Sequence, residues 1–266
     1  MPRFDVHQHL WPEPLVVALK RRSEPPRLRG SLLELREGSF ETDLSVHDLD
    51  HRLTLLDRDE IDIAIVSLPP TLGSDDAPEL GEAYDEGILE VAAAAAGRIR
   101  PLAAGRERDG FAGTCISAQR VVAEGLGAPT KPVFVHPGAA DPAPPGMPAW
   151  WTPVVDYTAE MQAAFAAVVA RGAPAVPVVF AILAGGGPFQ LERLSQRGDG
   201  AVLPGNLYFD TASYGRHALD LVVAACGSDR VVYGSDTPVM DPQATRQAIG
   251  DWFDHFAEEN PARIFE

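Results

Sequence analysis

Eight short runs of mainly β-branched and other apolar residues recur along this chain, and each ends in polar or glycine-containing punctuation. They occupy residues 3–9, 61–68, 98–104, 113–117, 132–136, 177–183, 206–211 and 230–234. Continuous apolar runs of this length are typical of strands buried on both faces of a parallel sheet. Helix-like stretches alternate with them at 47–59, 81–97, 158–172, 219–227 and 241–257. This alternation predicts an α/β fold, and eight strands favour a closed (β/α)8 TIM barrel over an open sheet.

The length of the chain fits one such barrel. It has 266 residues, close to the usual size of a single (β/α)8 domain, and two small domains are the competing count. We find no internal repeat and no interdomain linker, so we expect one domain over 1–266. No glycine-rich phosphate fingerprint follows the first strand, which disfavours a dinucleotide-binding fold.

Two long connections follow the first and fifth predicted strands. One spans 10–45, and the other spans 138–157 and contains several prolines with Trp150 and Trp151. In a barrel, segments that follow strands lie on the catalytic face, so we expect both to act as lids or pocket walls. The two tryptophans are predicted to contact substrate, although they could equally pin the loop in place.

Charge and composition exclude several function classes. The net charge of −16 disfavours nucleic acids and anionic lipids as partners, because both bind clustered lysine and arginine. No apolar run is long enough to span a membrane, and the start of the chain does not resemble a secretory signal. Cys115 and Cys226 are far apart, so two reduced thiols in a cytoplasmic protein are the default expectation, with a disulfide left open.

Three histidines and a carboxylate stand where barrel strands end. His7 and His9 are two residues apart on a predicted strand, so their side chains share a face and can reach one point. His136 ends the fifth run, and Asp236 follows the eighth. Imidazole and carboxylate groups converging at the mouth of a barrel could hold a divalent metal. Surface histidines, a core or capping histidine at 136 and a turn aspartate at 236 are the alternatives.

Three motifs resemble those of a known family. FDVHQH at 4–9, FVHPG at 134–138 and VVYGSDTP at 231–238 are similar to the first-, fifth- and eighth-strand signatures of the amidohydrolase-related branch of the amidohydrolase superfamily. That branch includes aminocarboxymuconate-semialdehyde decarboxylase, related aromatic-acid decarboxylases and pyrone-dicarboxylate lactonase. The resemblance spans about residues 3–242 and implies a single divalent metal held by His7, His9, His136 and Asp236.

The resemblance leaves the identity of the metal open. Zinc suits histidine and aspartate ligands, and manganese, iron or cobalt would suit the same set. The lactonase-like relatives also leave open a site that holds no metal. A small-molecule substrate and a homodimer are further expectations from the family.

One position departs from the family pattern. The relatives carry a histidine at the end of the sixth strand, in a stretch like Ala-His-Leu-Gly-Gly before a proline. Here residues 180–188 read FAILAGGGP, and Ile182 occupies that position. In the relatives this histidine is an acid/base beside the metal, and such a group contributes typically ~10²–10⁴-fold to the rate.

Three explanations for Ile182 remain open at this point. Asp236 could handle the proton alone. A group after the seventh strand could substitute, the candidates being Asp210, Ser213, Tyr214 and His217. Alternatively, the barrel binds a ligand without catalysing a reaction.

The first functional hypothesis is metal-dependent hydrolysis of a small amide, ester or lactone, in which the metal polarises a carbonyl and activates water while Asp236 moves the proton. Non-oxidative decarboxylation of an aromatic or unsaturated acid is the alternative, and a non-catalytic ligand-binding barrel is the third. Tyr214 and Arg216 are predicted to contact substrate. Arg216 could clamp a carboxylate, or it could simply be exposed at a helix start.

Overall fold

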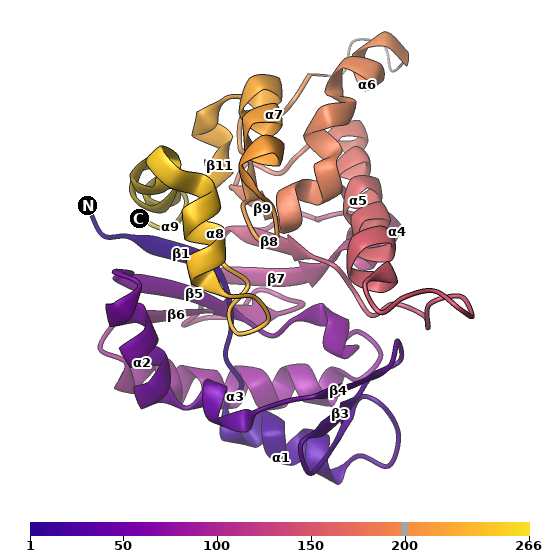
Figure 1. The fold of residues 1–266 in the computed structure, drawn as a ribbon, viewed down its shortest axis with the longest axis vertical. Helices are drawn as coiled ribbons and strands as arrows, with labels where there is room; N and C mark the ends of the chain where they lie inside the picture. Colours follow the sequence, from indigo (N-terminus) through magenta and orange to yellow (C-terminus); the bar gives the residue numbers. More distant parts are fainter. Residues whose placement is uncertain (198–201) are drawn as a thin grey trace.

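The computed structural model describes residues 1–197 and 202–266 and contains an eight-stranded parallel sheet (Figure 1). In hydrogen-bonded order its strands are β1 (Phe4–His9), β5 (Ile63–Ser67), β6 (Ile99–Ala104), β7 (Gly113–Ser117), β8 (Val133–His136), β9 (Val178–Phe180), β10 (Leu207–Asp210) and β11 (Val231–Val232). The last strand returns to the first, since the Val6 amide donates to the Tyr233 carbonyl at 2.9 Å and the His9 amide donates to the Thr237 carbonyl at 2.7 Å. The sheet is therefore a barrel, and the predicted fold is confirmed.

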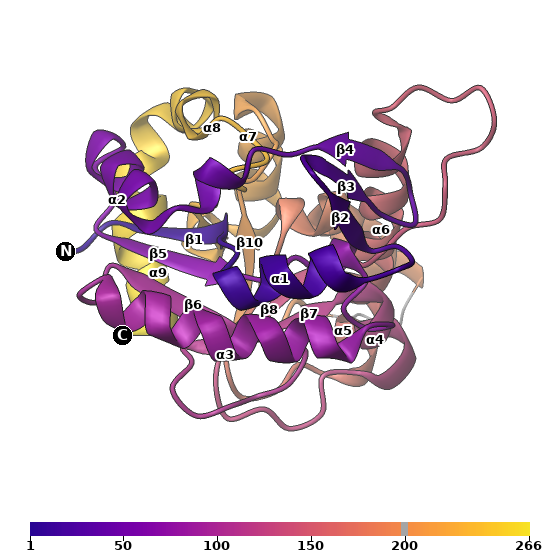
Figure 2. The ribbon, with the colours of Figure 1, turned by 90° about the horizontal axis from the view of Figure 1, so that it is seen from below.

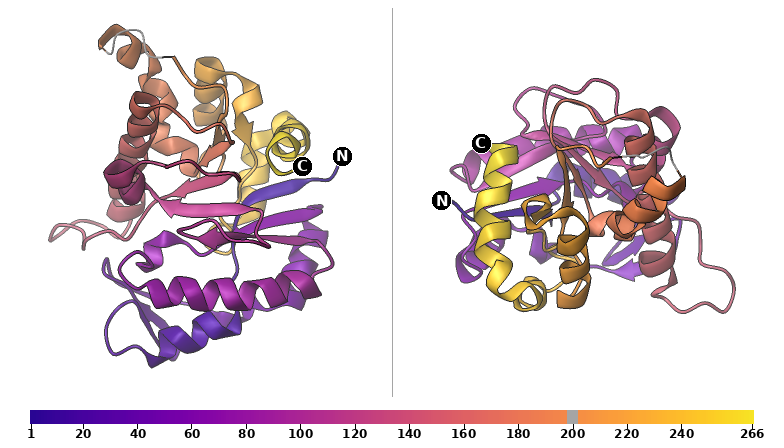
Figure 3. Two further views of the ribbon diagram at one scale, coloured as in Figure 1. Left: turned by 180° about the vertical axis from the view of Figure 1, so that it is seen from behind. Right: turned by 90° about the horizontal axis from the view of Figure 1, so that it is seen from above.

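Helices cover the outside of the barrel (Figure 3). They are α2 (Leu49–Arg58), α3 (Pro78–Ala94), α4 (Ala118–Glu124), α5 (Tyr157–Arg171), α6 (Leu191–Arg197), α7 (Arg216–Cys226), α8 (Pro242–Ile249) and α9 (Asn260–Phe265). The stretch predicted as one helix at 241–257 is interrupted after α8, because Gly250 has a left-handed φ of 58°. The short helices α4 and α6 were not predicted, since seven residues offer little helical periodicity.

The connection after β1 is ordered rather than an open loop. It contains α1 (Glu13–Arg21) and an antiparallel sheet of β2 (Arg27–Arg29), β3 (Leu32–Glu34) and β4 (Ser39–Glu41) (Figure 2). We call this three-stranded sheet the cap. Helix α1 packs closely against α3. The distance shows this: a Cβ built on Gly87 of α3 would come within 2.7 Å of Pro12 and Pro14. By contrast, 137–150 after β8 has no helix or strand and reaches out from the body (Figure 1).

Aromatic packing joins the helical layer to the sheet. Phe165 of α5 meets the rings of Phe180 and Phe209 edge-on, at centroid distances of 5.9 and 5.8 Å. Phe180 and Phe209 stack on each other at 6.2 Å, and all three are buried. Burying each phenylalanine contributes about 1.5–3 kcal/mol, so this cluster fixes β9 and β10 against α5.

A buried arginine holds the end of β1. Arg52 of α2 is fully shielded from solvent, and its Nη1 donates to Gln8 Oε1 at 2.8 Å while Nη2 donates to the His9 carbonyl at 3.0 Å. Burial lowers the pKa of the Arg52 guanidinium to about 10, against the opposing pull of the Asp5 carboxylate. The side chain is still charged at neutral pH, and it anchors the strand that carries His7 and His9.

Two features bear on expectations from composition. Cys115 and Cys226 are both free thiols, so no disulfide joins them. Within 1–197 and 202–266, the helices are all too short or too polar to cross a lipid bilayer.

The close approach of β7 and β8 gives a first prediction. A Cβ built on Gly113 would lie 2.3 Å from the Pro132 carbonyl oxygen, which is backbone and cannot rotate away. We expect Gly113→Ala to lower the free energy of unfolding by about 1–3 kcal/mol, measured by urea denaturation. Gly205→Ala is the matched control, because only the end of the Arg230 side chain approaches, at 3.7 Å, and its effect should stay within about 0.5 kcal/mol. Equal stability of the two variants would contradict this packing.

Candidate metal centre

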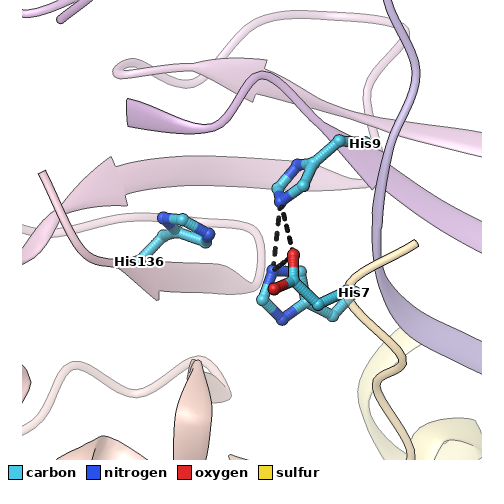
Figure 4. Close-up of side chains that lie close together, drawn as sticks. His7, His9 and His136 are labelled. Carbon is cyan, nitrogen blue, oxygen red and sulfur yellow. Dashed lines mark hydrogen bonds and ion pairs between the residues drawn. The ribbon is translucent and has the colours of Figure 1, made fainter. Parts of the chain in front are cut away.

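Four side chains converge at the carboxyl ends of the barrel strands (Figure 4). His7 and His9 come from β1, His136 ends β8, and Asp236 follows β11; one ligand atom from each lies within 4.8 Å of all the others. The Nε2 atoms of His7 and His9 are 3.2 Å apart, and Asp236 Oδ1 is 3.1 Å from His9 Nε2 and 3.4 Å from His7 Nε2. The strand-end positions in the sequence thus correspond to a single point in space.

Each imidazole is oriented through its other ring nitrogen. Nδ1 of His7 faces Asp210 Oδ2 at 2.6 Å, Nδ1 of His9 faces the Ser67 carbonyl at 3.1 Å, and Nδ1 of His136 faces the Pro137 carbonyl at 2.9 Å. These acceptors require a proton on Nδ1, which leaves each Nε2 available at the centre of the cluster. Acceptors behind the ring are the usual support for metal-binding histidines, so the donor set fits a divalent transition metal.

The cluster is short of positive charge. Burial disfavours a charged His7, but Asp210 and Asp236 outweigh it and raise the pKa of His7 to about 9. Burial lowers the pKa of His9 and His136, and a charged His7 adds to both shifts. Burial would raise the pKa of Asp236, yet the neighbouring imidazoles hold it below its ordinary value. A divalent cation would replace the proton on His7 and balance both carboxylates.

Asp210 supports His7 and is not free to act on a substrate. It is fully buried, and besides His7 it accepts hydrogen bonds from the amides of Ile182 at 2.8 Å and Ala212 at 3.0 Å. Of the other candidates for the missing acid/base, Ser213 and His217 are exposed, and Tyr214 is half-buried.

The backbone enters the left-handed region of φ at Ile182. The predicted sixth strand ran to residue 183, but β9 ends at Phe180, and residues 182–186 all have φ between 45° and 78°. Such a conformation costs roughly 1–2 kcal/mol for each residue with a side chain, so contacts must hold it in place. Two contacts do so: the Ile182 amide donates to Asp210 Oδ1 at 2.8 Å, and Gln162 Nε2 donates to the Gly185 carbonyl at 2.6 Å. An apolar side chain therefore follows β9 at the position where the resemblance in sequence implies a histidine.

The segment after His136 is clamped by two side chains that the sequence did not reveal. Glu160 accepts a hydrogen bond from the Gly138 amide at 3.0 Å, and Gln119 donates to the Ala139 carbonyl at 2.8 Å and to Glu160 at 2.9 Å. A Cβ on Gly138 would lie 2.4 Å from Gln119 Oε1, so a larger residue there would displace the Gln119 side chain. Neither Gln119 nor Glu160 stands in a recognisable motif, and no sequence signal marks them.

The four residues predicted to contact substrate have other partners in this structure. Trp150 is 56% exposed and stacks on Trp151 at 6.5 Å. Arg216 pairs with Asp220 on the same helix at 2.8 Å, and Tyr214 packs partly buried against the core. Their role in binding a substrate stays a prediction.

Comparison with known proteins relies on structure alone. No protein-family model and no curated protein matches the chain. The structure of IDCase from Metarhizium anisopliae in its apo form aligns with a TM-score of 0.75 and 18% identity over 99% of this chain and 97% of that one. A 2,6-dihydroxybenzoate decarboxylase complexed with 2,6-dihydroxybenzoate aligns at 0.66 and 15% identity over 100% and 99%. The chain has the fold of these proteins.

Two further similar structures widen the range of chemistry. A dihydroxybenzoic acid decarboxylase from Polaromonas sp., with bound manganese, aligns with a TM-score of 0.62 and 17% identity over 99% of this chain and 94% of that one. A 4-oxalomesaconate hydratase from Rhodopseudomonas palustris aligns at 0.64 and 15% identity over 99% and 95%. The fold implied by the resemblance in sequence is thereby confirmed, and the activity has to be argued from the site.

The support of His7 by Asp210 gives a second prediction. Asp210→Asn removes the charge behind the imidazole, and loss of such a partner typically weakens metal binding about 10–100-fold. We expect that loss for Zn²⁺ or Mn²⁺ in competition with a chromophoric chelator. Asp220→Asn on the exposed face of α7 is the control and should leave the affinity unchanged. Equal affinities in the two variants would show that Asp210 does not position His7.

Proposed function

We propose that this protein is a one-metal enzyme that removes CO2 from a small aromatic or unsaturated carboxylic acid. The observation that carries the proposal is the cluster of three oriented Nε2 atoms and one carboxylate at the mouth of the barrel. Several structures with this fold are decarboxylases, of 2,6-dihydroxybenzoate, 5-carboxyvanillate and dihydroxybenzoic acid, which favours this reaction over the others.

The residues that would hold the metal are His7, His9, His136 and Asp236. A divalent cation bound there would supply Lewis-acid binding of the substrate's carboxylate or of a neighbouring oxygen. Manganese, which the Polaromonas decarboxylase contains, and zinc both accept nitrogen and carboxylate ligands.

Asp236 is the side chain best suited to move the proton. In decarboxylation the bond between carbon and the carboxylate breaks, CO2 leaves, and a proton takes its place on carbon. Asp236 keeps 15% of its side chain exposed, whereas the side chains of His7 and His9 keep 0% and 3%. Because its pKa is held low, Asp236 begins ionised and takes up a proton before it can deliver one. Ile182 offers no proton, and Asp210 remains engaged with His7.

Hydrolysis of an amide, ester or lactone is the second candidate, and one observation favours it. Among the described residues, no lysine or arginine side chain contacts the side chains of His7, His9, His136 or Asp236. A substrate carboxylate would therefore have no ion-pair partner beside the metal, which a neutral substrate does not need. An ionised Asp236 also suits a general base that deprotonates water.

The third prediction separates the two reactions. Protein loaded with Mn²⁺ or Zn²⁺ is incubated with hydroxylated benzoates and with lactones in H2(18)O, and CO2 release and product mass are measured. We expect CO2 release, no (18)O in the organic product, and loss of turnover with chelator. Asp236→Asn should slow turnover by at least about 10²-fold, and Asp220→Asn should not.

Other results would point elsewhere. Incorporation of (18)O into the product without CO2 release would identify a hydrolase instead. If the metal-loaded protein binds a ligand saturably and the ligand is recovered chemically unchanged, a non-catalytic barrel would be favoured.

A further inference from the structure

The candidate metal centre is almost sealed from solvent. His7, His9 and His136 are 1%, 2% and 6% exposed, although they stand at the ends of their strands. In a barrel of this kind a substrate enters from the face where the strands end. The segments on that face therefore control how a substrate reaches the imidazoles.

The cap is tied to two separate parts of this face. Its turn between β3 and β4 carries Arg36 and Glu37 side by side. The Tyr157 hydroxyl, at the start of α5 after β8, donates to Glu37 Oε1 at 2.6 Å. Arg36 forms an ion pair with Asp76 in the connection after β5. Two strands, β6 and β7, separate β5 from β8 in the barrel, so one short turn bridges distant parts of the rim.

The two contacts differ in strength. Arg36 and Asp76 are 47% and 64% exposed, and an exposed ion pair of this kind contributes little. Glu37 and Tyr157 are half-buried, and a hydrogen bond to a carboxylate is among the stronger kinds. The contact between Glu37 and Tyr157 is therefore the main restraint on the turn.

The second carboxylate oxygen of Glu37 disfavours the same contact. Glu37 Oε2 is buried and has no hydrogen-bond partner among the described residues. Burial raises the pKa of Glu37, although the Tyr157 hydroxyl and the backbone amide of Ala140 oppose this. An unpaired buried oxygen is costly in the closed arrangement and would be hydrated once the turn lifts away. The tip of the hairpin is thus held mainly by the hydrogen bond to Glu37, with the weaker Arg36–Asp76 ion pair beside it, while Leu33 of β3 anchors its base in the hydrophobic core.

We propose that the β3–β4 hairpin, residues 32–41, is a gate over the metal centre, latched by the hydrogen bond from Tyr157 to Glu37. The inference rests on the proposed function, since the imidazoles at this mouth of the barrel are those that would hold the metal. Opening of the gate admits substrate, and its closure excludes water from the site.

The test measures access to the imidazoles and requires no metal. The full chain is treated with chelator and then with diethyl pyrocarbonate, which acylates accessible imidazole nitrogen, and labelling of each histidine is followed by peptide mass spectrometry. We expect Tyr157→Phe to label His9 and His136 on the order of tenfold faster than the wild type, as loss of a charge-assisted hydrogen bond implies. Glu37→Gln, which keeps an acceptor but loses the charge, should give a smaller acceleration.

Two controls separate gate opening from general loosening. His217 is exposed on α7, so its labelling rate should be the same in every variant. Tyr84→Phe also removes one hydroxyl hydrogen bond, from buried Tyr84 of α3 to the Val66 carbonyl at 3.2 Å, and it should not speed labelling at the centre. Unchanged labelling of His9 and His136 in both latch variants, or equal acceleration in Tyr84→Phe, would overturn the gate. Because metal is absent throughout, either result is independent of whether the centre binds metal.

Discussion

The buried carboxylate of Asp210 is the contact on which the candidate centre depends. It stands at the end of β10 and contacts His7 on β1. It also accepts a hydrogen bond from the amide of Ile182 after β9. One side chain thereby fixes a ligand ring, the end of a neighbouring strand and the start of the left-handed turn. Removing its charge would leave the His7 ring without orientation and the strained backbone at Ile182 without one of its restraints.

Charge balance explains why this arrangement points to a cation. Asp210 and Asp236 flank three imidazoles, and burial favours the neutral form of each ring. In the protein alone, one proton on His7 offsets part of the negative charge. Buried charges persist only when they are paired, so the donors, their orientation and their charge all favour a divalent metal. Closure by the cap would strengthen these interactions by excluding water.

Short-range patterns predicted the barrel, and the position of the residues at strand ends, with the resemblance to a known family, predicted the cluster. Eight apolar runs mark eight strands, and spacing of two on a strand brings His7 and His9 to one side. The cap could not be predicted, since its three strands have three residues each and pair through tertiary contacts. The contact between Glu37 and Tyr157 joins residues 120 positions apart with no motif at either. The left-handed turn at Ile182 looked like the continuation of a strand, because its apolar residues fit that pattern.

The central claim is that His7, His9, His136 and Asp236 hold one metal ion. Its most direct test is the metal content of protein purified without chelator, by elemental analysis, beside a His7→Ala/His9→Ala variant. The account predicts about one equivalent of a divalent transition metal per chain, lost in the variant. Absence of metal in the native protein even after reconstitution, or equal metal in the variant, would contradict it.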